Sequence, residues 1–103
     1  MSKINIQDIE RDNAGDFYDN FRERLLSIEQ FPSIYTFKFI IPNNVDNRDK
    51  IEKIFEHPST QIQHKDSKTG KYNSLTVKTF VNHADEVIAY YKKVAMIDKV
   101  IML

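Results

Sequence analysis

The stretch TQIQHKDSKTGKYNSLTVKTFV, from Thr60 to Val81, contains two strand-like segments around a short polar linker. The strands are TQIQHKD and YNSLTVKTFV, and SKTGK joins them. Gly70 stands where a hairpin loop of this length favours a positive φ, which glycine adopts without steric cost. Alternate residues of the second strand should face the core, namely Leu75, Val77, Thr79 and Val81. The stretch therefore predicts a β-hairpin.

The segment before the hairpin predicts a strand followed by a helix. IYTFKFIIP, residues 34–42, is rich in β-branched and aromatic residues and ends at a proline. Its core side should carry Tyr35, Phe37, Phe39 and Ile41, with Thr36 and Lys38 facing outward. A helix should then run from Asn44 or Asp46 to about His57, because Ile51, Ile54 and Phe55 recur at helical spacing before Pro58.

The segment after the hairpin predicts a second helix and a last strand. Asn82 is predicted as the N-cap, with Asp85 at capping-box spacing. The apolar face of this helix should carry Val87, Ile88, Tyr91 and either Val94 or Ala95. The chain ends with the strand KVIML. The order strand-helix-strand-strand-helix-strand predicts an α+β, ferredoxin-like βαββαβ domain over residues 31–103, with a four-stranded antiparallel sheet and two helices on one face.

The N-terminal third predicts a flexible arm and an additional helix. Residues 1–15 lack strong periodicity and are predicted to be the arm. The helix should span residues 16–30 with Asp16 as its N-cap. It has an apolar stripe of Phe17, Phe21, Leu25 and Ile28. We expect this stripe to dock on the open face of its own sheet or on a second subunit.

Composition restricts the possible functions. The chain has 103 residues, 41% hydrophobic and 29% charged, with no cysteine and a net charge of +0. These values are typical of one globular domain, and zero net charge argues against a dedicated nucleic-acid binder. The charge is uneven, since residues 1–33 hold four Lys/Arg and seven Asp/Glu. The N-terminus resembles no signal peptide and no long apolar run follows, so we expect a cytoplasmic protein without a membrane span.

The hairpin loop contains the residues that most resemble a ligand site. A phosphate-binding P-loop is excluded, because SKTGKYNS has one glycine and leads into a strand instead of a helix. Lys68 and Lys71 remain candidates for a weak anion site. His57, His64 and His83 lack the spacing of metal ligands. We therefore predict no metal, no cofactor and no catalytic residue, and a protein that is not an enzyme.

The pattern of the core resembles the YbeD-like family of small bacterial proteins of unknown function. The resemblance rests on FPSIYTFKFI, on Ser67-x-x-Gly70-x-Tyr72-x-Ser74 followed by TV, and on IDKVIML, and it covers Phe31 to Leu103. It implies a ferredoxin-like fold akin to the ACT regulatory domain and a bacterial cytosolic setting. It implies no catalytic residues. ACT domains that bind amino acids generally have glycine after the first strand, where this chain has IPNNVDNR.

The predicted fold leaves one sheet face without a helix. The outward positions form a candidate interaction face, made of Ile34, Lys38, Ile40, Tyr72, Lys78, Phe80 and Ile101. This mixture is more apolar than a solvated face requires, and such patches are often contacts. We expect a non-enzymatic regulatory or protein-interaction module with an unknown protein partner or self-association. An ACT-like sensor of an amino acid or anion is the first alternative, and an RNA-binding domain is the second.

Overall fold

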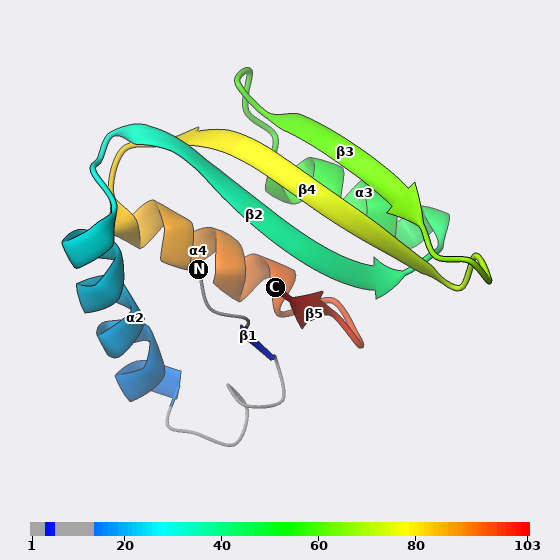
Figure 1. Ribbon diagram of the computed structural model, residues 1–103, viewed down its shortest axis with the longest axis horizontal. Coiled ribbons are helices and arrows are strands. Elements are labelled where there is room, and N and C mark those ends of the chain that lie inside the picture. The colour runs from blue at the N-terminus through cyan, green and yellow to red at the C-terminus, as the bar shows by residue number, and fades with distance from the viewer. Residues whose placement is uncertain (1–3, 6–13) are drawn as a thin grey trace.

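The computed structural model describes residues 4–5 and 14–103. They form β1 (Ile4–Asn5), α2 (Ala14–Ile28), β2 (Ser33–Pro42), α3 (Val45–Ile54), β3 (Gln61–Asp66), β4 (Tyr72–Val81), α4 (Ala84–Val94) and β5 (Ile101–Met102). The strands lie in one sheet in the order β1-β5-β2-β4-β3, and every pairing is antiparallel. From β2 onward the chain has the predicted βαββαβ order, and β5-β2-β4-β3 is a strand order compatible with the ferredoxin-like fold (Figure 1).

The ladder between β2 and β4 forms the middle of the sheet. Its register runs from Ser33 opposite Val81 to Pro42 opposite Tyr72. The alternation is as predicted, and the residues on the helix side are buried: Tyr35, Phe37, Phe39, Ile41, Leu75, Val77, Thr79 and Val81. The buried Thr79 hydroxyl lies 2.9 Å from that of Thr60, so its polar atom has a partner. The opposite side of both strands therefore forms the second face of the sheet.

Helix α3 begins as one of the two predicted starts requires. The Asn44 side chain accepts a hydrogen bond of 2.8 Å from the backbone N–H of Asn47, which makes Asn44 the N-cap. The helix ends at Ile54, where Phe55 still donates to the Ile51 carbonyl. Ile51 and Phe55 are buried and Ile54 is partly buried, so the predicted apolar face packs on the sheet.

Helix α4 starts one residue later than predicted. Its N-cap is His83, which makes no side-chain capping bond, so the assignment of Asn82 as N-cap is wrong. Glu86, not Asp85, accepts hydrogen bonds from the backbone and side chain of Asn82, at 2.8 and 3.0 Å. These bonds lower the pKa of the Glu86 carboxyl. The cap differs from the prediction because the carboxylate that bonds to Asn82 belongs to Glu86, four positions later. The Asp85 carboxylate instead pairs with Arg22.

Aromatic rings fill the space between the sheet and its helices. The ring of Phe37 lies within 6.0 Å, centroid to centroid, of five others: Tyr35, Phe39, Phe55, Tyr90 and Tyr91. Burial raises the pKa of Tyr91 strongly, and the neighbouring Tyr35 adds to this shift. Burial also raises the pKa of Tyr35, while its hydrogen bond to Tyr91 lowers it. The core thus contains a pair of tyrosines that must stay neutral.

The N-terminal helix does not dock on the open face of its own sheet. Figure 1 shows α2 beside α4, on the helix side of the sheet. The ring centroids of Phe21 and Tyr91 lie 5.3 Å apart, and Arg22 Nε donates to Asp85 Oδ1 at 2.6 Å. Lys92 Nζ lies 4.8 Å from the centre of the Tyr18 ring. The expectation that α2 covers the open face of its own sheet is wrong, because α4 has a second side to bury, and the expectation that α2 contacts a second subunit stays a prediction.

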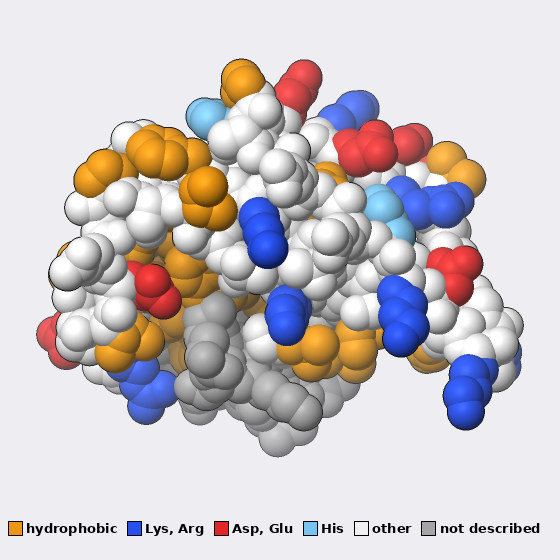
Figure 2. Space-filling view, turned by 45° about the horizontal axis from the view of Figure 1, so that its top comes forward, with side chains coloured by type: hydrophobic (Ala, Val, Ile, Leu, Met, Phe, Trp, Pro, Cys, Tyr) orange, Lys and Arg blue, Asp and Glu red, His pale blue; other side chains and the backbone are white. Residues whose placement is uncertain are grey.

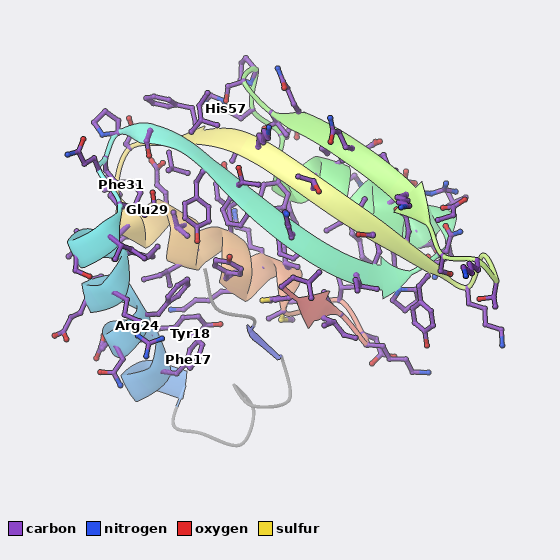
Figure 3. The ribbon with its side chains drawn as sticks, viewed as in Figure 1. Phe17, Tyr18, Arg24, Glu29, Phe31 and His57 are labelled. Atoms are coloured by element: carbon purple, nitrogen blue, oxygen red, sulfur yellow. The ribbon has the colours of Figure 1, made fainter. Side chains whose placement is uncertain are left out.

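The apolar stripe of α2 is also rotated from its predicted position. Leu25 is 1% exposed, and Phe17 and Phe21 are partly buried, but Ile28 is 67% exposed. Tyr18 is buried in its place and lies with Phe17 at the N-terminal end of the helix (Figure 3). Tyr18 precedes Phe21 by three positions and Leu25 by seven, which is also one face of a helix. Asp16 lies inside the first turn, since the helix begins at Ala14.

The predicted flexible arm is only partly covered by the described residues. Residues 1–3 and 6–13 lie outside them. Ile4 and Asn5 form β1, which pairs with Met102 and Ile101 of β5. The sequence analysis did not foresee this strand, because a two-residue strand carries no periodicity that a sequence pattern could reveal, and the flexibility of the arm stays a prediction.

Candidate interaction surface

The face of the sheet that points away from α3 and α4 is here named the outer face. Its positions follow from the strand register, since Ile34, Thr36, Lys38 and Ile40 of β2 lie opposite Phe80, Lys78, Thr76 and Ser74 of β4. Ile101 of β5 lies opposite Ile40 on the other side. All seven residues of the predicted interaction face are strand residues at outer-face positions. Whether this face binds a partner stays a prediction.

Each end of the outer face carries apolar side chains. At one end Ile34 and Phe80 lie opposite each other and are 65% and 36% exposed. At the other end Tyr72 and Ile101 are 44% and 41% exposed. They line a shallow groove of about 460 Å³ together with Ile40, Lys65, Asp66, Ser67 and Ser74. The apolar side chains thus form two clusters. Ile34 and Phe80 are here named the Ile34 cluster, and Tyr72 and Ile101 the Tyr72 cluster.

The middle of the outer face is polar and basic. Lys38 and Lys78 lie on neighbouring strands, each opposite a threonine, and both are exposed. Lys65 of the edge strand β3 lies opposite Ser74 and adds a third lysine. No outer-face position of β2, β3, β4 or β5 is Asp or Glu. In Figure 2 blue side chains cross the middle of this view between orange ones, and red side chains lie toward its margins.

The sequence analysis missed the contribution of β3 to this face. Gln61, Gln63 and Lys65 lie opposite Lys78, Thr76 and Ser74, so they share the outer side. Once the hairpin was predicted, pairing the two strands across SKTGK would have placed these residues. The polar character of β3 hid it, because its six residues are almost all exposed and show no hydrophobic alternation.

The loop SKTGK is a hairpin turn, as predicted. Gly70 has a φ of +73°, and its N–H donates to the Ser67 carbonyl at 2.9 Å. The Asn43 backbone N–H and side chain donate to the carbonyls of Lys71 and Gly70, both at 2.9 Å, which ties the hairpin to the loop before α3. The side chains of Lys68 and Lys71 are exposed. Anion binding by these two lysines stays a prediction.

The three histidines lie in different places. His57 Nδ1 accepts from the Ser59 backbone N–H at 3.1 Å, in the turn that leads into β3 (Figure 3). His64 Nδ1 lies 3.0 Å from Asn73 Oδ1, and His83 is the N-cap of α4. Within residues 4–5 and 14–103, no three His, Asp or Glu side chains come together as a metal site would need. The described histidines therefore lie in a turn, in a strand pair and at a helix N-terminus.

Residues 27–103 match the family described as a protein of unknown function, DUF493, which is the YbeD-like family. The chain belongs to this family. The match includes β2, β3, β4 and β5, but β1 lies outside it and so does almost all of helix α2, which ends at Ile28. No curated protein matches the chain. The helix that covers α4 is thus an addition to the part that defines the DUF493 family.

None of the helices in residues 14–103 combines the length and the hydropathy that crossing a membrane requires.

Proposed function

We propose that this member of the DUF493 family is a non-enzymatic protein-interaction module of the bacterial cytosol, with the outer face as its binding surface. One observation carries the proposal. Ile34, Tyr72, Phe80 and Ile101 are each more than a third exposed on a single sheet face that no described helix covers. Large apolar side chains gathered on one face of a soluble domain mark contact sites.

RNA binding is less well supported by the same face. Domains of this topology that bind RNA stack neighbouring bases on aromatic rings of the two central strands. Here the outer-face aromatics are Tyr72 and Phe80, both on β4 and eight positions apart. At about 3.3 Å per residue they lie roughly 26 Å apart, too far to stack adjacent bases. The remaining large apolar side chains are isoleucines, which cannot stack bases.

An ACT-like sensor of a small molecule is less well supported for a different reason. Small ligands are usually enclosed in concave pockets that bury most of their surface. The groove beside Tyr72 lies on the sheet surface between exposed side chains. A flat partner surface fits this shape better than a single amino acid does.

Site-specific photo-crosslinking in the native cell tests the proposal. A photoreactive residue replaces Thr76, in the middle of the outer face, and a matched control replaces Asp49, which is exposed on α3. We expect a discrete protein adduct from position 76 that is absent from position 49. Adding Ile34→Asp and Ile101→Asp should abolish it. Equal adducts from both positions, or none from position 76, would contradict the proposal.

A ligand screen separates the alternatives. Thermal shift of the purified chain is measured with amino acids, inorganic phosphate, nucleotides and short RNAs. The proposal expects no shift that depends on Lys68 and Lys71, the candidate anion site. A phosphate-dependent rise in melting temperature that Lys68→Ala with Lys71→Ala abolishes would favour the sensor instead.

A further inference from the structure

The charges of the outer face restrict the chemistry of its partner. Lys38, Lys65 and Lys78 are exposed, and within residues 14–103 no carboxylate lies at ion-pair distance from any of them. Asp66 borders the Tyr72 cluster, but one of its oxygens accepts a hydrogen bond of 2.8 Å from Asn73. The complement of this face is a surface with carboxylates in its middle and apolar side chains at its ends.

The strand pairing restricts the shape of the partner. Strand β2 pairs with β4 along its whole length, but β5 pairs with its other side only at Phe39 and Ile40. Backbone N–H and C=O groups in a sheet point sideways toward neighbouring strands, and only side chains point out of its faces. An extended peptide laid on this face would find no backbone partners for its own N–H and C=O groups, which is costly on burial. A helix satisfies its backbone internally and presents only side chains. Helices commonly pack on the apolar face of a sheet for this reason.

A second copy of the sheet fits the outer face poorly. Face-to-face packing would bring Lys38, Lys65 and Lys78 of both copies into one interface. No outer-face strand position supplies a carboxylate to pair with them. Unpaired like charges brought together at an interface repel each other, so self-association through this face is disfavoured.

We propose that the occupant of the outer face is an acidic amphipathic helix of a partner protein. This inference rests on the proposed function and specifies its partner. The helix lies along β2 and β4, with apolar side chains in the Ile34 and Tyr72 clusters and Glu or Asp side chains over Lys38 and Lys78. Ile34 and Ile40 are six strand residues apart, or roughly 20 Å. A helix of about 14 residues spans that length.

An NMR titration of the full chain tests the inference. The probe is a designed helical peptide with leucines at both ends of one face and glutamates between them. The matched control is the same peptide with each glutamate replaced by lysine. We expect the acidic peptide to shift the backbone amides of β2 and β4, and to bind at least about tenfold more tightly than the basic peptide.

Charge-reversed variants make the test specific. Lys38→Glu with Lys78→Glu should lower the affinity for the acidic peptide by about tenfold or more, and the doubly substituted chain should bind the basic peptide more tightly than the acidic one. Lys50→Glu with Lys53→Glu, on the exposed side of α3, changes the net charge equally and should leave both affinities unchanged. Unchanged β-strand amide dispersion in each variant confirms that it remains folded.

Each other outcome overturns the inference. Equal binding of both peptides, shifts confined to the helix side, or no shifts at millimolar peptide would do so. Concentration-dependent shifts of β2 and β4 without peptide would identify a second copy as the occupant. Tighter binding of a short single-stranded RNA than of the acidic peptide would identify nucleic acid. If the peptide fails while the crosslink from position 76 persists, the outer face is still an interaction surface but its partner has other chemistry.

Discussion

The conformation of single residues decides how the hairpin closes. Gly70 has a φ of +73°, and a Cβ added there would meet no atom within 4 Å. Any cost of a side chain at this position therefore comes from the backbone and not from a clash. A β-branched residue is the least able to adopt this conformation.

Gly70→Val should lower the free energy of unfolding by about 1 kcal/mol or more, because valine is strained at positive φ. Gly70→Asn is the matched control, since asparagine enters the left-handed region far more readily. Urea unfolding of both variants measures the difference. Equal stability of Gly70→Val and the unchanged chain would refute the turn assignment.

The buried tyrosines predict loss of stability at alkaline pH. Burial raises the pKa of Tyr91 in the folded state, so the unfolded state releases this proton first, from about pH 10. The unfolded chain then binds fewer protons, and the free energy of unfolding falls as the pH rises above about 10. Tyr91→Phe should make this fall shallower, whereas Tyr72→Phe on the outer face should not. Parallel pH profiles for all three proteins would contradict the prediction.

Residue patterns predicted the sheet better than the helix ends. Alternation identified Tyr35, Phe37, Phe39 and Ile41 as core residues because a strand has only two sides. It could not distinguish Asn82 from His83 as the cap of α4, since both positions precede the same apolar face. The side chain that decides is Glu86, whose bonds to Asn82 depend on the path of the backbone.

At the scale of the element, helix α2 shows which features sequence periodicity can predict and which it cannot. A stripe of apolar residues indicates that a helix is buried, but it does not identify the surface that buries it. The pairing of Phe21 with Tyr91 and of Arg22 with Asp85 depends on the side of α4 that the sheet leaves free. The sequence analysis assigned that role to the outer face or to a second subunit, because the βαββαβ pattern accounts for only one side of α4.

Two alanine substitutions in α2, one at a buried and one at an exposed aliphatic residue, test how this helix docks. Leu25→Ala should cost about 2–5 kcal/mol, because Leu25 is 1% exposed among core residues. Ile28→Ala should change stability by less than about 0.5 kcal/mol, because Ile28 is mostly exposed. Thermal and urea unfolding measure both. A larger loss of stability from Ile28→Ala than from Leu25→Ala would show that Ile28 is buried, as the predicted stripe required.

At the scale of the whole molecule, the family boundary coincides with a structural one. The match begins at residue 27, while α2 occupies Ala14–Ile28 and covers α4 from outside the sheet and its two helices. The order of the remaining elements could be predicted, because two capped helices and a hairpin agree with one topology. The place of α2 could not, because that topology does not include it.

Removal of residues 1–26 should therefore leave the βαββαβ domain folded but less stable. Tyr91 loses the neighbouring ring of Phe21, so the melting temperature should fall and the binding of an apolar dye should rise. The deletion also removes β1 from beside Ile101, whereas the outer-face positions of β2, β3 and β4 should keep their places. Identical stability and dye binding in the shortened chain would show that α2 contributes nothing to the core.

The register of the central ladder also determines the order in which this chain can fold. The β3–β4 hairpin joins residues as close as Asp66 and Asn73, whereas β2 meets β4 only across thirty positions at Pro42 and Tyr72. The loop-closure entropy grows with that separation, so the hairpin should form first and β2 should zip onto it from Pro42 toward Ser33. The end that carries Ile34 and Phe80 closes last, and by the same route opens first. Tyr35 and Phe39 lie opposite Thr79 and Leu75 and point their backbone groups toward β4. Native-state hydrogen exchange should be faster at Tyr35 than at Phe39, which would make the Ile34 cluster the adaptable half of the outer face and the Tyr72 cluster its fixed half.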